Sequence, residues 1–134
     1  MEGSLIAMNA LGKHILAEYY GCDASILNNL ELLEQSMLKA VMKSGATIID
    51  STFHQFSPQG VSGVIVIAES HMAMHTWPEY CYAAIDFFTC GNRVDPYKAF
   101  DFMNEILKSE KSSTKELMRG IIAHESQKLL EIPL

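Results

Sequence analysis

The sequence has few of the features that mark a nucleic-acid-binding or disulfide-stapled protein. It has 10 basic against 16 acidic residues, a formal net charge of −6 over 134 residues. Binding to nucleic acid needs clustered lysine and arginine, so this charge argues against that class of function. There are only three cysteines. An odd number without tight spacing is typical of reduced thiols rather than of a disulfide framework.

Long apolar runs are also missing. The longest obvious one, Val64 to Ala68, is far shorter than the roughly 20 residues that a membrane-spanning helix needs. The N-terminus opens Met1-Glu2-Gly3 and has no basic segment followed by a long apolar one, so no secretory signal is expected. We therefore predict a cytoplasmic protein without membrane or nucleic-acid partners.

What the sequence does contain is the composition of one globular domain. It is 49% hydrophobic and 19% charged, a balance that disordered chains do not reach. A chain of this length buries a core without help from disulfides or metals. We find no internal repeat and no composition shift, so residues 1–134 are predicted to form a single domain.

The spacing of apolar residues predicts alternating strands and helices. A stripe at steps of three and four predicts one helix between an N-cap at Asp23 and a glycine cap at Gly45. A second helix is expected from Asp95-Pro96 to about Ser109, because proline favours the first helical position. Lys108 to Ser113 reads as a loop. Strands are expected at 11–20, 47–53, 61–68, around 70–75, at 81–89, and as one or two edge strands from Thr114.

This order of elements predicts the fold class. Consecutive strands with short links favour antiparallel pairing. Two helices on one face of such a sheet make an α+β two-layer sandwich. The opposite face of the sheet would then be free to pack on another copy of the chain.

The chemistry-bearing residues concentrate between Ser62 and Cys90. If the segment after Ser70 is extended, a period of two places His71 and His75 on one face and Ser70 on the other. His71, His75 and Cys90 could suggest zinc, but the paired-cysteine spacing of such sites is absent, so no metal is expected. No serine-hydrolase elbow surrounds Ser70. These positions alone indicate only a small α+β domain with a candidate site near His75.

A longer pattern carries more information. Residues 60–71 read Gly-Val-Ser-Gly-Val-Ile-Val-Ile-Ala-Glu-Ser-His, and residues 74–80 read Met-His-Thr-Trp-Pro-Glu-Tyr. Together with Phe88-Thr89-Cys90-Gly91, these segments closely resemble the prokaryotic S-adenosylmethionine decarboxylase proenzymes. The resemblance covers about residues 10 to 107.

The resemblance implies a self-cleaving proenzyme. The serine matching Ser70 attacks the carbonyl of Glu69, and elimination and hydrolysis leave a pyruvoyl group on the new terminus. The chain would divide into residues 1–69 (β chain) and 70–134 (α chain). By the same resemblance Ser62 and His75 support processing. Histidine suits this role because its ordinary pKa of about 6.5 lets it take a proton near neutral pH.

The resemblance also implies the reaction and its substrate site. The pyruvoyl ketone would form a Schiff base with the α-amine of S-adenosylmethionine and accept the electrons released with CO₂. Cys90 would return a proton to the substrate α-carbon, which gives decarboxylated S-adenosylmethionine, the aminopropyl donor for spermidine synthesis. Glu79 would accept hydrogen bonds from the ribose, and Phe56 and Trp77 are candidates for flanking the adenine or the sulfonium. The family places its site between two protomers, so a homodimer of cleaved units is expected.

Two alternatives stay open at this stage. A pyruvoyl-dependent arginine decarboxylase of the same fold would use the same serine, histidine and cysteine, since these act on the common amino-acid end of the substrate. Arginine would need carboxylates aimed at a guanidinium, whereas Glu79 and Phe56 suit adenosine. A non-processing regulatory or binding relative is the other alternative, and nothing in the four processing and catalytic positions favours it.

Overall fold

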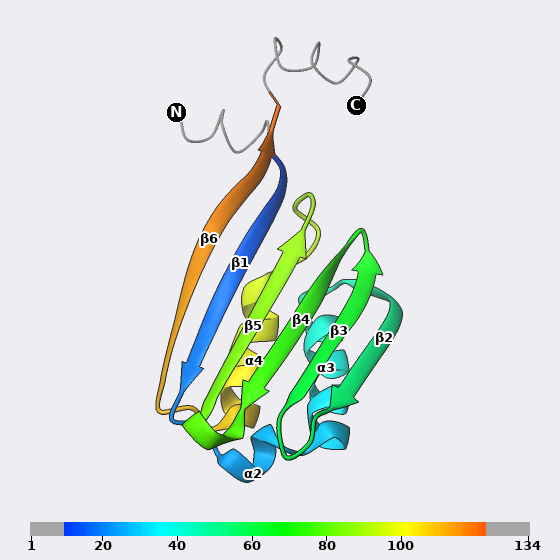
Figure 1. Cartoon of the computed structure of the whole chain (residues 1–134). Coiled ribbons are helices and arrows are strands. Elements are labelled where there is room, and N and C mark those ends of the chain that lie inside the picture. The colour runs from blue at the N-terminus through cyan, green and yellow to red at the C-terminus, as the bar shows by residue number, and fades with distance from the viewer. Residues whose placement is uncertain (1–9, 123–134) are drawn as a thin grey trace, which may run out of the picture.

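The computed structural model describes residues 10–122, which form one sheet backed by helices (Figure 1). In chain order the elements are β1 (Ala10–Tyr20), α2 (Ala24–Leu27), α3 (Leu30–Ser44), β2 (Thr47–Gln55), β3 (Val61–Ala68), β4 (Ser70–Trp77), a 3₁₀ turn η1 (Pro78–Tyr80), β5 (Tyr82–Thr89), α4 (Pro96–Leu107) and β6 (Lys111–Ile121).

The sheet has six strands in the order β2-β3-β4-β5-β1-β6, and every neighbouring pair is antiparallel. Figure 1 shows α3 and α4 side by side behind the same face. The predicted α+β two-layer sandwich, with two main helices on one face of an antiparallel sheet, is therefore confirmed. No helix within residues 10–122 is long and apolar enough to cross a membrane.

Strict alternation along the inner strands separates the two faces of the sheet. In β4, Met72 and Met74 are fully buried, while His71 and His75 point to the opposite side. The buried face packs on apolar side chains of α3 and α4, including Met37 and Met103. Complete burial of such a side chain stabilises the fold by about 1.5–3 kcal/mol. The other face of the sheet has no helix over it among the described residues.

The first helical segment differs from the prediction. One continuous helix was expected after Asp23, but the chain breaks between α2 and α3. Asn29 caps α3 by accepting a hydrogen bond from the backbone N–H of Leu32 at 3.1 Å. Asn28 instead accepts one from the backbone N–H of Gly60 at 2.9 Å. Two adjacent asparagines thus end one helix and begin the next. The glycine cap at Gly45 is as predicted, with a φ of 91°.

The C-terminal strand also begins earlier than predicted. Lys108 to Ser113 was expected to be a loop, but α4 ends at Leu107 and β6 starts at Lys111. The link is short because Lys108 adopts a left-handed cap and the Glu110 N–H already bonds the Tyr20 carbonyl at 2.9 Å. β6 is exposed along its whole length, so it lacks the apolar alternation that would have revealed it. A second edge strand, if it follows, lies outside the described residues.

Candidate active site at the two ends of the sheet

Ser70 lies at the tightest turn of the sheet. Ile67 of β3 pairs with Ser70 of β4, so only Ala68 and Glu69 connect the two strands. Glu69 is exposed, and the Ser70 hydroxyl contacts the carbonyl oxygen of Glu69. The hydroxyl is therefore next to the peptide group that the sequence predicts to break.

Cys90 reaches the same turn from the neighbouring strand. It follows β5 directly and is exposed, and its Sγ lies 3.7 Å from the Ser70 Oγ. β4 and β5 are adjacent, with His71 opposite Phe88, so the start of one strand meets the end of the other. The structure thus brings together the predicted cleavage residue and the predicted proton donor, which are 20 positions apart.

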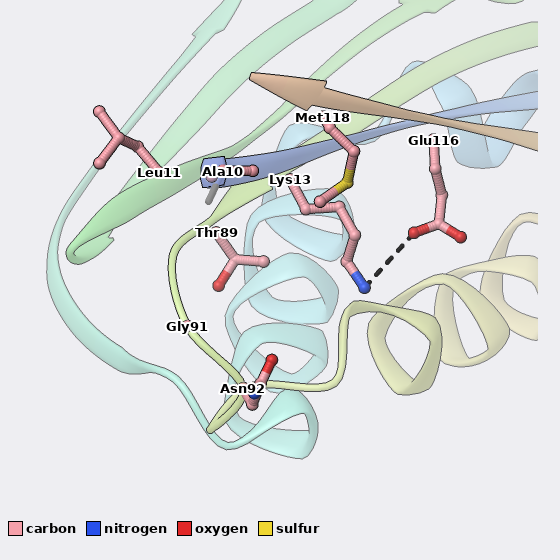
Figure 2. Close-up of a pocket in the computed structure, with 9 residues that line it drawn as sticks. Ala10, Leu11, Lys13, Thr89, Gly91, Asn92, Glu116 and Met118 are labelled. Carbon is pink, nitrogen blue, oxygen red and sulfur yellow. Dashed lines mark ion pairs between the residues drawn. The ribbon is translucent and has the colours of Figure 1, made fainter. Parts of the chain in front are cut away.

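Two hollows flank the loop that follows Cys90. One, of about 470 Å³, is lined by Glu69 and Cys90 together with residues of the α3–β2 turn. The other, of about 520 Å³, lies between β1, β6 and the same loop. Figure 2 shows this second hollow, where Lys13 reaches toward Glu116 and pairs with it at 3.4 Å. Only the first hollow includes Cys90 itself, so it is the better candidate for a substrate at this turn.

Ser62 and His75 form a second pair of functional side chains. They lie directly opposite each other on β3 and β4, and Ser62 Oγ is 2.8 Å from His75 Nδ1. A serine that bonds one ring nitrogen fixes the orientation of the imidazole and leaves Nε2 for another partner. The predicted processing pair is therefore assembled, and His75 is exposed on the open face of the sheet.

The predicted substrate-binding residues lie at the same end as His75. The Trp77 ring is 6.2 Å from the His75 ring, and Glu79 follows in the exposed turn η1. Phe56 comes directly after β2, where its N–H bonds the Gly60 carbonyl at 2.8 Å. Its ring packs edge-on against His54 at 4.6 Å.

The site residues predicted from the sequence therefore fall into two groups. His75 is five residues along β4 from Ser70, and a strand rises by about 3.3 Å per residue, which separates them by about 17 Å. Ser70 and Cys90 stand at one end of the sheet, while Ser62, His75 and the substrate residues stand at the other. The His71, His75 and Cys90 set considered for zinc is not brought together.

A third cluster was missed in the sequence. His14, His71 and Asp86 meet on the open face, from three adjacent strands. His14 Nε2 is 2.6 Å and His71 Nε2 is 3.3 Å from the same Asp86 oxygen. The clue in the sequence was Asp86 itself, the one carboxylate in an otherwise apolar strand. Only the register of β1 against β5 places His14 beside it.

The comparisons with known proteins agree on one family. The family model described as S-adenosylmethionine decarboxylase matches residues 13–120. A proenzyme of that name from Thermosipho africanus is 57% identical over 84% of this chain and 87% of its own. The proenzyme from Caldicellulosiruptor saccharolyticus is 55% identical over 85% of this chain and 92% of its own.

Solved structures give the same result. The crystal structure of adenosylmethionine decarboxylase from Aquifex aeolicus superposes with a TM-score of 0.79 and 36% identity, covering 88% of this chain and 98% of that one. The Trypanosoma brucei AdoMetDC monomer is only 17% identical with a TM-score of 0.57, so that likeness concerns the fold alone. The resemblance found in the sequence is confirmed.

Proposed function

The chain belongs to the S-adenosylmethionine decarboxylase family, and we propose that it cleaves itself between Glu69 and Ser70 and then decarboxylates S-adenosylmethionine with a pyruvoyl group made from Ser70. The observation that carries the proposal is the exposed turn where the Ser70 hydroxyl contacts the Glu69 carbonyl. Cys90 Sγ lies 3.7 Å from the same hydroxyl. The enzyme would be a carboxy-lyase, and a cytoplasmic location stays a prediction.

Cleavage needs only protein groups and one water. The Ser70 oxygen attacks the Glu69 carbonyl carbon, and the amide nitrogen leaves with a proton, so an ester replaces the amide. A base then removes the Ser70 α-proton, and the Glu69 carboxylate leaves with the C–O bonding electrons. The resulting dehydroalanine tautomerises to an imine, which water hydrolyses to a ketone and ammonia. Products of 69 and 65 residues follow, because 134 − 69 = 65.

The pyruvoyl group supplies the electron sink that decarboxylation requires and that no ordinary side chain offers. The residues around Ser70 fit such a group, since Cys90 is the neighbouring proton source and Glu69 becomes a free carboxylate beside the 470 Å³ hollow. A thiol beside the reacting carbon is suited to returning a proton to it. We therefore assign to Cys90 the proton that the substrate α-carbon receives after CO₂ departs.

The predicted processing base, His75, does not reach Ser70 of its own chain. The two residues lie about 17 Å apart along β4, because both belong to the same extended strand. A second copy brings the two residues together if the open faces of the two sheets pack against each other. A two-fold axis between the sheets and perpendicular to the strands places one end of each sheet over the opposite end of its partner. Ser62 and His75 of the partner subunit would serve Ser70.

The open face has the composition expected of such a contact. Val64 and Val66 stand 36% and 42% exposed there, and Ala73 and Phe88 lie on the neighbouring strands of the same face. A patch of exposed apolar side chains marks an interaction surface. The proposed homodimer of cleaved units would bury this patch and complete two sites.

The substrate would then span both copies. Its amino-acid end would lie at Ser70 and Cys90, and its adenosine end at Glu79, Phe56 and Trp77 of the partner subunit. An acid accepts hydrogen bonds from ribose hydroxyls, and aromatic faces attract a cationic sulfonium. This pairing favours S-adenosylmethionine over arginine, and so do the names of the relatives from Thermosipho and Caldicellulosiruptor.

Purified protein should test the proposal directly. We expect a denaturing mass spectrum with two fragments, residues 1–69 and 70–134, the second with a pyruvoyl terminus. We also expect CO₂ release from carboxyl-labelled S-adenosylmethionine but not from labelled arginine. CO₂ from arginine alone would support the arginine alternative. A stable single chain would support a non-processing relative.

The Glu79→Gln variant tests the substrate end. We expect the KM for S-adenosylmethionine to rise about tenfold, which is the value of one charge-assisted hydrogen bond, while cleavage proceeds at the wild-type rate. Steady-state kinetics on fully cleaved protein measure this. Glu105→Gln, which alters an exposed acid on α4, is the matched control and should change neither quantity. An unchanged KM in Glu79→Gln would remove Glu79 from the ribose site.

A further inference from the structure

The third cluster on the open face connects the strands that carry Ser70 and Cys90. Asp86 lies on β5, four residues before Cys90. His71 lies on β4 and directly follows Ser70. The bond between His71 Nε2 and Asp86 Oδ2, at 3.3 Å, therefore connects the start of β4 to the second half of β5 by side chains as well as by the backbone ladder.

His14 and Phe88 hold this bond in place. Phe88 packs against both imidazoles, with ring centroids 5.4 Å from His14 and 5.9 Å from His71. His14 donates to the Asp86 oxygen at 2.6 Å, and its Nδ1 lies 3.4 Å from an Arg119 guanidinium nitrogen. A guanidinium only donates and a carboxylate only accepts, so His14 accepts a hydrogen bond through Nδ1 and donates one to Asp86 through Nε2.

The Nε2 atoms of His14 and His71 both lie within hydrogen-bond distance of one Asp86 oxygen, so the three side chains form one network. The side chains of His14, Asp86 and His71 are 16%, 23% and 37% exposed. Bonds to a carboxylate in such a half-buried setting are stronger than on an open surface. The network is therefore suited to holding side chains in fixed positions.

Cleavage changes what restrains Ser70. In the uncut chain, the turn through Ala68 and Glu69 joins it covalently to β3. In the cut chain it is the first residue of a new terminus, and chain termini fray unless something anchors them. His71 is the next residue, so its bond to Asp86 is the first side-chain anchor that the new terminus has.

We propose that Asp86 is a positioning residue that holds His71, and through it the residue-70 terminus, in register against Cys90 once the chain is cut. The inference rests on the proposed conversion of Ser70 to a pyruvoyl group. It predicts different effects on self-cleavage and on turnover, although both steps involve residue 70. The uncut turn is held from both sides, so self-cleavage depends weakly on Asp86, whereas turnover by the cut enzyme depends on it strongly.

The Asp86→Asn variant tests this in the full-length protein. We expect cleavage to go to completion by intact mass. The kcat of the cut enzyme should fall about 10- to 100-fold with KM within about twofold of wild type, since small misplacement of reacting groups has effects of this size. Amide exchange at residues 71–74 should accelerate in the cut variant. It should not accelerate when Ser70→Ala keeps the same variant uncut.

Two further variants make the outcome decisive. His71→Phe keeps a ring against Phe88 and loses only the bond to Asp86, so it should reproduce the fall in kcat. Glu116→Gln removes a carboxylate that pairs with Lys13 beside the other hollow and should leave kcat unchanged. Wild-type kcat in cut Asp86→Asn, or an equal loss of cleavage and turnover, would overturn the inference. An uncut wild-type chain would instead overturn the proposed function on which it rests.

Discussion

The Ser70→Ala variant should remain one uncut chain of full length with decarboxylase activity at background. The variant lacks the hydroxyl that contacts the Glu69 carbonyl at the turn, so no ester forms and no pyruvoyl group follows. Enzymes accelerate such reactions by about 10⁶-fold or more, and no other side chain provides the electron sink. Intact mass and CO₂ release measure both losses on one sample.

A matched serine makes this result specific. Ser113 lies on the exposed edge strand β6, away from the turn, and Ser113→Ala should be cut and should turn over like the wild type. The far-ultraviolet circular dichroism of Ser70→Ala should equal that of the control, because the residue is not part of the buried core. A cut product from Ser70→Ala would remove Ser70 from the mechanism.

Mixing two inactive variants should restore part of the activity. Ser70→Ala lacks the cleavage residue but keeps Ser62 and His75, whereas His75→Ala lacks the base but keeps Ser70 and Cys90. In a mixed dimer with shared sites, one of the two sites is complete. Random pairing of co-expressed chains makes half of the dimers mixed, so about one quarter of wild-type activity should return.

Mass spectrometry identifies which chain is cut in that experiment. Only the chain carrying His75→Ala should be cleaved, because its own Ser70 is served by His75 of the partner subunit. His75→Ala alone should stay uncut, since neither chain of its dimer supplies the imidazole of His75. Cleavage of His75→Ala by itself would contradict the shared-site arrangement. A mixture of the two variants that stays wholly uncut and inactive would contradict it as well.

The sequence predicted the fold well wherever a local pattern reports burial. The β-branched run of β3 and the cap at Asp95 ahead of α4 were placed to within a residue. The break at Asn28 was missed because its cause is tertiary, a bond to Gly60 in a distant loop. The start of β6 was missed because an edge strand exposed on both faces needs no apolar alternation.

The candidate site was predicted as a list of residues but not as an arrangement. Ser62 and His75 are 13 positions apart, and only the β3–β4 register makes them a pair. Ser70 and His75 are far apart because the segment between them is one extended strand, and the spacing of the motif alone did not distinguish that from a turn at Ser70. Asp86 was overlooked because its partners come from β1 and β4, and a single carboxylate in a strand predicts nothing until the strand order is known.

The strand order has a consequence for the molecule after self-cleavage. Residues 1–69 hold β1, β2 and β3, and residues 70–134 hold β4, β5 and β6. In the sheet order β2-β3-β4-β5-β1-β6 the two products alternate, so β1 is inserted between two strands of the other product. The fragments are thus interleaved and share three seams of backbone hydrogen bonds. Neither fragment can dissociate without breaking these backbone hydrogen bonds. Unfolding of the cleaved molecule therefore includes a dissociation step, and its midpoint depends on protein concentration.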